Sequence, residues 1–351
     1  MTEVLLVSPY EEKARGGIAV WTDSYLKNCS KYGINCTLMN IAMIGKRAVQ
    51  GNAKRSIMDE IIRTTGIFKR LSKLLKTKEY HCAHLNTSCG EFGLIRDYLT
   101  AKIIKKKQPK AKLIVHFHCN IEDQCKTKLS LSFLKKIVSI SDKCLVLNEQ
   151  SKAFLDNGFI IESVVVNNFI ASNWIKKDLK NIRHKIEKVI FVGYVQPQKG
   201  INEIYEVSRK LPEIKFNLVG EVRDDIRGLS KPDNINLVGA MTKEEIRDML
   251  DDSDLFLFPT HSEGFSLALL ESMARGVPAI TTDVGSNKAM IEDNGGVIVP
   301  INDASSIEKA IRELSSNREL RTKMSVWSVQ KVMRSYTEDI VFNGFMNLYC
   351  N

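Results

Sequence analysis

Two glutamates, Glu263 and Glu271, follow a short apolar run in a stretch that combines carboxylates, glycines and a helix signal. The run 255–258 predicts a buried strand of a parallel sheet, because it shows no polar alternation. A helix is predicted over 266–275, so Glu263 lies in the loop at the carboxyl end of the strand, and Glu271 lies about two turns into the helix. In open parallel sheets ligands bind at that edge, and the amides of a helix N-terminus attract anions such as a diphosphate. The stretch therefore predicts a site for a long ligand that two carboxylates contact at different points.

The residues around the glutamates read Pro-Thr-x-x-Glu-Gly-Phe, then Glu271, Gly276 and Pro278. This pattern resembles the E-x7-E signature of retaining, GT-B-fold glycosyltransferases of family 4. The resemblance implies an α/β protein of GT-B fold, with two Rossmann-like domains whose parallel sheets face a central cleft. It also implies that Glu263 holds hydroxyls of the donor sugar and that Glu271 accepts the ribose hydroxyls. The alternative is an ordinary strand–helix–strand unit with surface glutamates.

A second stretch, 188–200, resembles the family segment Val-Gly-Arg-Leu-x-x-x-Lys-Gly, in which an Arg and a Lys neutralise the donor phosphates. Lys199 matches the Lys, whereas Tyr194 occupies the position of the Arg. A phenol donates one hydrogen bond but carries no charge at neutral pH. Either Arg15 or Arg223 replaces the missing charge, or the leaving group is stabilised less strongly.

In the first half of the chain, a strand predicted over 112–118 carries His116 and His118 on one side, because side chains alternate along a strand. The resembling transferases place a histidine near the donor sugar and the acceptor at this strand end. His118 is therefore the candidate and His116 the alternative, and each could instead be a hydrogen-bonded core histidine. The pair Gly16-Gly17 follows the first predicted strand, where glycines let the backbone approach a phosphate closely.

The predicted site combines these residues with others that the resemblance assigns, including Gly239 and Met241 beside the nucleobase. The predicted catalytic residues are Glu263, His118 and Lys199. The predicted donor-binding residues are Gly16, Gly17, Gly193, Tyr194, Lys199, Gly239, Met241, Glu263, Gly264, Phe265, Ser266, Leu267 and Glu271. The six histidines show no metal-ligand spacing, so no metal and no cofactor are predicted beyond a UDP- or GDP-sugar co-substrate.

The length of 351 residues exceeds what one core usually supports, so two domains are expected. The predicted domains are 1–170, a Rossmann-like acceptor domain joined by a C-terminal helix at about 336–351, and 188–335, a Rossmann-like nucleotide-sugar domain. The polar stretch 171–187 is the predicted linker.

The net charge of +10 is unevenly placed. Residues 1–170 hold 27 Lys and Arg against 15 Asp and Glu, whereas 171–351 hold 24 against 26. A helix predicted over 56–76 is amphipathic and basic, which favours either a solvated face or contact with an anionic membrane surface. Its expected apolar side is Ile57, Ile61, Thr65, Phe68, Leu71 and Leu75, and its basic residues are Arg63, Lys69, Arg70, Lys73 and Lys76.

No stretch reaches the roughly 18 apolar residues of a membrane helix, and the N-terminus does not resemble a signal peptide. The expectation is a cytoplasmic protein that can bind the inner face of the plasma membrane peripherally. The basic residues are scattered over several helices without a recognition motif, so no nucleic-acid partner is expected.

The sequence thus predicts a hexosyltransferase-type enzyme (EC 2.4) that moves a sugar from a nucleotide sugar to a lipid-linked or saccharide acceptor. The Lys-, Ile- and Asn-rich composition is typical of a bacterial chain and favours surface polysaccharide synthesis. The alternatives are a GT-B-fold sugar-nucleotide epimerase or phosphorylase, or a catalytically weak sugar-nucleotide-binding homologue. A retaining glycoside hydrolase fits poorly, because its two carboxyls must lie about 5–5.5 Å apart across one bond.

Overall fold

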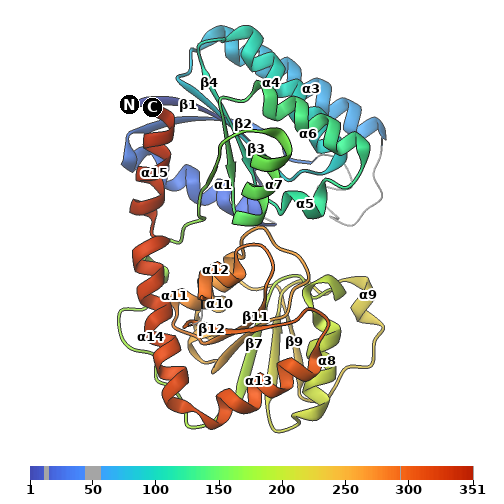
Figure 1. Cartoon of the computed structure of the whole chain (residues 1–351), viewed down its shortest axis with the longest axis vertical. Helices are drawn as coiled ribbons and strands as arrows, with labels where there is room; N and C mark the ends of the chain where they lie inside the picture. The colour runs from blue at the N-terminus through green and yellow to red at the C-terminus, as the bar shows by residue number, and fades with distance from the viewer. Residues whose placement is uncertain (12–15, 44–56, 293, 351) are drawn as a thin grey trace. The chain divides into compact units, whose positions relative to one another are not determined.

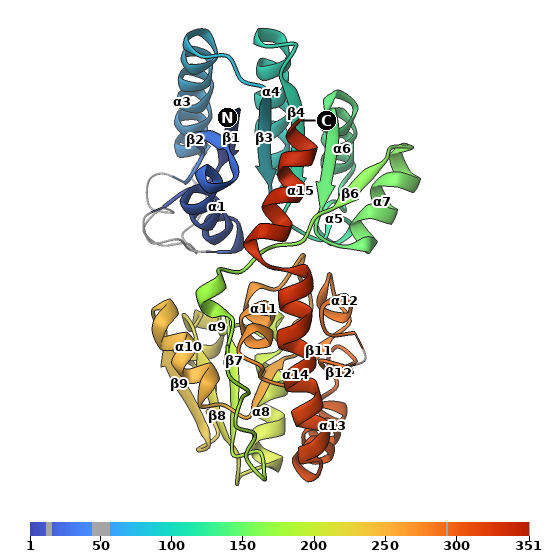
Figure 2. The same cartoon turned by 90° about the vertical axis from the view of Figure 1, so that its left-hand side faces the viewer.

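The computed structural model describes residues 1–11, 16–43, 57–292 and 294–350. The chain forms two compact units. Unit 1 comprises Met1–Asn168 together with Asp339–Asn351, and unit 2 comprises Phe169–Glu338. Each unit contains a six-stranded parallel sheet between layers of helices (Figures 1 and 2).

The sheet of unit 1 has the strand order β2-β1-β3-β4-β5-β6. Its strands are β1 (Thr2–Ser8), β2 (Ile34–Asn40), β3 (Cys82–Thr87), β4 (Lys112–Phe117), β5 (Lys143–Val146) and β6 (Ser163–Val165). Its helices are α1 (Gly17–Asn28), η1 (Cys29–Tyr32), α3 (Ile57–Thr77), α4 (Glu91–Lys107), α5 (Ile121–Gln124), α6 (Lys128–Ile140), α7 (Glu149–Phe159) and most of α15 (Glu338–Cys350). The central strands are buried on both faces, as expected for near-continuous apolar runs in a parallel sheet.

Helices cover the two faces of this sheet in different ways. On one face α3, α4 and α6 lie side by side (Figure 1), and Ile67, Leu94 and Leu134 belong there to one buried apolar cluster that also contains Leu5 of β1. On the other face α1 packs against α15, where the rings of Tyr25 and Phe342 stack with centroids 5.2 Å apart. The C-terminal helix is therefore part of the core of unit 1.

The predicted apolar side of α3 is wrong at its N-terminal end. Ile61 is 52% exposed, whereas Arg63 is buried and donates to Glu60 at 2.8 Å. The face that packs on the sheet follows Arg63, Ile67, Leu71 and Leu75, which stand four residues apart. Pairing with Glu60 offsets part of the cost of burying the guanidinium, so a charged residue can continue the buried row.

The sheet of unit 2 has the order β12-β11-β10-β7-β8-β9. Its strands are β7 (Lys188–Val192), β8 (Lys215–Val219), β9 (Ile235–Gly239), β10 (Leu255–Phe258), β11 (Ala279–Thr282) and β12 (Gly296–Val299). Its helices are η2 (Ser172–Trp174), η3 (Pro197–Lys199), α8 (Ile201–Lys210), α9 (Asp224–Arg227), α10 (Lys243–Asp251), α11 (Leu267–Ala274), α12 (Asn287–Ile291), α13 (Ala304–Ser316) and α14 (Arg318–Ser335). The chain leaves β7 toward β8 on one side and later returns to β10 on the other. The edge between β7 and β10 is thus a topological switch point, where ligands bind in open α/β sheets.

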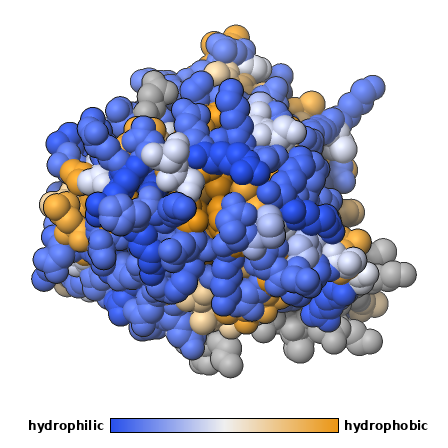
Figure 3. Space-filling model, turned by 90° about the horizontal axis from the view of Figure 1, so that it is seen from below, coloured by the Kyte–Doolittle hydropathy of each residue, from blue (hydrophilic) through white to orange (hydrophobic). Residues whose placement is uncertain are grey.

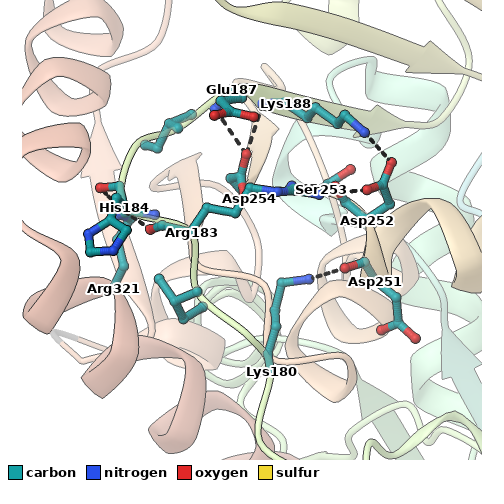
Figure 4. A network of polar contacts seen from close by, with 12 residues as sticks. Lys180, Arg183, His184, Glu187, Lys188, Asp251, Asp252, Ser253, Asp254 and Arg321 are labelled. Atoms are coloured by element: carbon teal, nitrogen blue, oxygen red, sulfur yellow. Dashed lines mark hydrogen bonds and ion pairs between the residues drawn. The ribbon is translucent and has the colours of Figure 1, made fainter.

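The stretch 171–187 is packed onto unit 2 by a network of polar contacts (Figure 4). The Lys180 ammonium donates to the carbonyl oxygens of Leu250 and Asp251 at 3.0 and 2.7 Å, and so caps the end of α10. Arg183 donates to Asp252 and to the buried Asp254. These contacts fix the stretch to α10 and β10.

The surface of the chain is largely polar. On the face drawn in Figure 3, hydrophilic side chains predominate and the hydrophobic ones form limited areas. Among the described residues, every helix is too short or too polar to cross a membrane.

Candidate functional site

Lys199 and Glu263 form an ion pair at the switch point of the unit 2 sheet. Lys199 ends η3 after β7, and Glu263 lies in the loop after β10, the strand that pairs with β7. Both side chains are mostly buried, with 19% and 15% exposed. The Lys199 ammonium also lies 5.7 Å from the centroid of the Phe258 ring. The sheet therefore brings a cation and a carboxylate together where a ligand is expected.

The loops that carry this pair are fixed to each other. Gly200 has φ 77°, and a Cβ there would overlap the carbonyl oxygen of Pro259, so the position requires glycine. The His261 amide donates to the Gln198 carbonyl oxygen at 3.0 Å, and the His261 ring bonds Glu203 at 2.9 Å. The geometry of the pair is thus set by backbone contacts between neighbouring loops.

Helix α11 begins at Leu267, four residues after Glu263. Ser266 caps it by accepting from the Leu269 amide at 3.1 Å, so the hydroxyl is engaged within the helix. Phe265 is buried, with its ring 5.6 Å from that of Tyr336, and can face a ligand only through its backbone. The amides of Leu267 and the next residue have no helical partner and carry the positive end of the helix dipole.

Glu271 lies within α11, and burial raises the pKa of its carboxyl to about 7. The positive charge of Lys243 lowers the pKa by a smaller amount. Among the described residues, its carboxylate accepts no hydrogen bond, although part of the side chain remains exposed. A desolvated carboxyl without a partner is a frequent feature of binding sites.

Tyr194 lies directly beyond β7, and the guanidinium of Arg223 lies over its ring. Arg15, the other residue considered as a source of charge, lies outside the described residues. Gly193 hydrogen-bonds the end of β8 through its amide. Gly239 ends β9 and Met241 follows it, so both lie at the same carboxyl edge of the sheet.

The remaining predicted residues belong to unit 1. Gly16 has φ 83° and precedes α1, and both Gly16 and Gly17 are exposed. His118 follows β4, with its ring centroid 4.0 Å from that of His116 and 5.0 Å from that of Trp21. Burial lowers the pKa of His118 to about 3, with a smaller effect from His84, so the imidazole is neutral at pH 7.

His116 belongs to a chain of buried hydrogen bonds that passes through Tyr349 of α15 to Tyr25 of α1. The Tyr349 hydroxyl bonds Nδ1 of His84 at 2.6 Å, and Nε2 of His84 bonds Nδ1 of His116 at 3.2 Å. Burial lowers the pKa of His84 to about 3 and that of His116 well below its usual range. His116 is thus a hydrogen-bonded core residue, and its ring supports His118.

Sequence reasoning missed His84, Trp21 and Tyr349. A signal for His84 was present, because polar His84 and Asn86 alternate within an otherwise apolar buried strand. Asn86 pairs in register with His116 on the neighbouring strand. Tyr349 carried no such signal, since it contacts His84, which lies 265 residues earlier in the sequence.

Comparison with known proteins matches residues 172–326 to the family model described as "Glycosyl transferases group 1". The chain is 25% identical over 302 residues to a Klebsiella pneumoniae protein named as an uncharacterized 41.2 kDa protein in the cps region, covering 78% of this chain and 84% of that one. It is 24% identical over 266 residues to the O-antigen chain mannosyltransferase C of Escherichia coli, covering 69% and 70%. Among solved structures, Anabaena HepE in complex with UDP and glucose matches with a TM-score of 0.74 and 12% identity over 99% of both chains.

These findings confirm two of the predictions from sequence. The two units, each with a parallel six-stranded sheet between helices, have the α/β GT-B fold. The match to the group 1 transferases and the named relatives show that the chain is a glycosyltransferase (EC 2.4).

Proposed function

We propose that this glycosyltransferase moves a sugar, with retention of configuration, from a UDP- or GDP-sugar to a lipid-linked or saccharide acceptor of a bacterial surface polysaccharide. The observation that carries the proposal is the Lys199–Glu263 pair at the switch point, next to the N-terminus of α11. The relative from Escherichia coli named as an O-antigen mannosyltransferase supports the polysaccharide acceptor. The likeness to HepE, whose structure holds UDP, supports a uridine nucleotide.

The reaction breaks the bond between the anomeric carbon of the sugar and a phosphate oxygen of the donor. Positive charge grows on the sugar ring while negative charge grows on the diphosphate. Lys199 and the α11 amides are already oriented before the reaction, so they stabilise the diphosphate without reorganisation. Glu263 holds sugar hydroxyls and shields the cationic ring. The acceptor oxygen bonds the anomeric carbon on the face that the phosphate leaves, and its proton passes to the departing phosphate oxygen.

The proposal gives roles to four further residues. Glu271 accepts hydrogen bonds from the ribose hydroxyls, which gives its unpartnered carboxylate two donors. His118, neutral and packed against the tilted ring of His116, orients the donor sugar and the acceptor. Gly16 and Gly17, which have no Cβ, allow the backbone at the start of α1 to approach the diphosphate.

A panel of UDP, GDP, ADP and CMP in thermal unfolding tests the proposal. A nucleotide present at 100 times its dissociation constant should add about 2.7 kcal/mol to the free energy of unfolding. The matching nucleotide sugar is then incubated with candidate acceptors, and NMR of the product reports its anomeric configuration. Stabilisation by none of the four nucleotides would contradict the proposal, and an inverted product would contradict retention.

A sugar-nucleotide-binding protein with weak turnover is the second candidate. Tyr194 favours it, because this residue brings no charge to the leaving group. Nucleotide binding without measurable transfer or donor hydrolysis would support this candidate.

Nucleotide affinity is expected to depend on pH through Glu271. Hydrogen bonds from ribose favour the ionised carboxylate, so binding should lower a pKa that is about 7 in the free protein. The free protein then releases a proton on binding, and affinity should fall about ten-fold from pH 8 to pH 6. Calorimetry in buffers of different ionisation enthalpy measures the released proton. In Glu271→Gln both the proton release and this pH dependence should vanish; their persistence would remove Glu271 from the site.

Transfer is expected to be independent of divalent metal, because Lys199 and backbone amides meet the charge of the diphosphate. The described residues hold no cluster of three or more His, Cys, Asp or Glu side chains placed to bind a metal. In the sequence Asp252-Ser253-Asp254, the two carboxylates already accept hydrogen bonds from Arg183, Lys188 and backbone amides. Initial rates with EDTA and with added manganese should agree; loss with EDTA and recovery with manganese would contradict this expectation.

Peripheral binding to an anionic membrane is expected through the exposed side of α3. Among the side chains that the structure describes, three apolar ones are exposed near its start, and basic ones follow along the helix. They are Met58, Ile61 and Ile62, then Lys69, Arg70, Lys73 and Lys76. Each basic residue contributes at most about 1 kcal/mol near an anionic surface, and salt screens this attraction.

Co-sedimentation with phosphatidylglycerol vesicles measures this binding, which should be lost at high salt. Replacing Lys69 and Lys73 by Glu should weaken it at least several-fold. Lys323→Glu, on the exposed side of α14 in unit 2, is the control. Equal weakening by the control, or equal binding to neutral vesicles, would exclude α3 as the contact.

A further inference from the structure

Tyr194 and Arg223 form a stacked pair at the carboxyl ends of β7 and β8. The guanidinium carbon of Arg223 lies 4.2 Å from the centroid of the Tyr194 ring. Strands β7 and β8 are hydrogen-bonded neighbours, so the two residues meet although they are far apart in sequence. Tyr194 carries no charge of its own, but its ring holds the positively charged guanidinium of Arg223 at this position.

The backbone fixes Arg223 in this position. Val195 and Val222 form an isolated parallel bridge beyond the two strands. The Arg223 amide donates to the Val195 carbonyl oxygen at 3.0 Å, and the Val195 amide donates to the Glu221 carbonyl oxygen at 3.0 Å. Gly220 approaches the Gly193 carbonyl so closely that any Cβ would overlap it. The guanidinium thus projects from a rigid backbone.

Most hydrogen-bond donors of Arg223 remain unused. Its Nη1 donates to the Glu221 carboxylate at 3.0 Å, and its side chain is only 19% exposed. Among the described residues, its Nε and Nη2 groups donate to no protein atom. A guanidinium carries five N–H donors in a planar fork that suits phosphate oxygens. A mostly buried side chain whose free donors still reach solvent is suited to an anionic ligand.

The pair lies beside the Lys199 site. Phe258, over which Lys199 lies, stacks with Phe191 at a centroid distance of 5.7 Å. A Cβ on Gly193, the residue before Tyr194, would contact both of these rings. Gly193, the neighbour of Tyr194, and Lys199 therefore adjoin the same aromatic cluster.

We propose that Arg223, held by the Tyr194 ring, contacts the donor diphosphate and supplies the second positive charge beside Lys199. The inference rests on the proposed function and adds to it a donor-binding residue outside the resembling motif. On binding, the diphosphate takes up free donors of the fork and draws the guanidinium away from Glu221, whose side chain is 42% exposed and can return to solvent.

The test compares three variants with the wild type: Arg223→Ala, the double variant Tyr194→Arg/Arg223→Ala, and Arg227→Ala as the control. Arg227 lies four residues further along, is 64% exposed and pairs with Asp224, so its loss removes an equal charge near the site. Calorimetry measures the dissociation constants of UDP and uridine, and of GDP and guanosine. Thermal unfolding shows whether each variant is folded.

Arg223→Ala should lower the affinity for the nucleoside diphosphate by about ten-fold or more, equivalent to about 1.4 kcal/mol. The affinity for the nucleoside should be unchanged. The double variant should recover most of the lost diphosphate affinity, because the arginine at position 194, beyond β7, again places a guanidinium beside the diphosphate. Arg227→Ala should bind like the wild type.

Several results would overturn the inference. Unchanged diphosphate affinity in Arg223→Ala, with normal binding by the wild type, would overturn it while the proposed function stands. Equal weakening of nucleoside and diphosphate, or no recovery in the double variant, would make Arg223 a structural residue. Failure of the wild type to bind either diphosphate would overturn the proposed function and this inference together.

Discussion

Replacing Lys199 by methionine is expected to lower kcat by about 10²–10³-fold, the usual effect of removing one preorganised group that stabilises charge in the transition state. Methionine keeps most of the side-chain volume and removes the ammonium that pairs with Glu263. The nucleoside part of the donor should still bind, because its proposed contacts are with Glu271 and with the loop of Gly239 and Met241. The measurement is the rate of nucleotide release from the donor, with and without acceptor.

Two comparisons make this result interpretable. Lys210→Met removes a partly exposed ammonium that pairs with Glu206 on α8, and should change kcat by less than about two-fold. Glu263→Ala should also lower kcat. In the double variant with Lys199→Met, the fold-decrease in kcat should be smaller than the product of the two single decreases, because the residues act as a pair. A Lys199→Met protein that is folded and transfers sugar at the wild-type rate would contradict the proposed mechanism.

Replacing Asp254 by alanine is expected to destabilise unit 2 by about 3 kcal/mol or more. Its carboxylate is 3% exposed and accepts from the amides of Glu187 and Lys188, each at 2.9 Å, and from Arg183. Alanine would leave the amides and the guanidinium without their acceptor at the start of the central strand β7. Urea unfolding followed by circular dichroism measures the loss.

Asp252 provides a matched control for this variant. It also pairs with Arg183 and Lys188, but its side chain is 55% exposed. Because solvent screens such pairs, Asp252→Ala should cost about 1 kcal/mol at most. Similar losses for the two variants would show that burial of the Asp254 carboxylate does not govern the stability of this contact.

The sequence predicted the architecture well where local patterns determine it. The apolar run of β10, the glycine that ends α11 and the capping box of α10 all mark element boundaries, and their alternation with helices predicts parallel sheets. Strand β2 was not predicted, although Ile34, Cys36 and Leu38 alternate with polar residues as in a half-buried strand. The prediction of the buried side of α3 was wrong at its N-terminal end, because a paired arginine, Arg63, occupies a core position there.

The site was predictable to a lesser extent. Motif resemblance selected Lys199 and Glu263 separately, whereas their ion pair depends on which strands become neighbours. Spacing along the chain holds no information on the pairing of β7 with β10 rather than with a later strand. The same limit applies to Tyr194 and Arg223, and to the hydrogen bond between His84 and Tyr349.

The placement of α15 has a consequence for the order in which the units can fold during translation. Unit 2 is complete in sequence at Glu338, whereas unit 1 still lacks Asp339–Asn351 at that moment. Until those residues leave the ribosome, Tyr25 and His84 lack the partners that Phe342, Phe345 and Tyr349 provide. At about 5–20 residues per second this face of unit 1 stays uncovered for many seconds while all of unit 2 is made. The domain that is synthesised first is therefore the last to be finished, and its open aromatic face is where a chaperone would be needed.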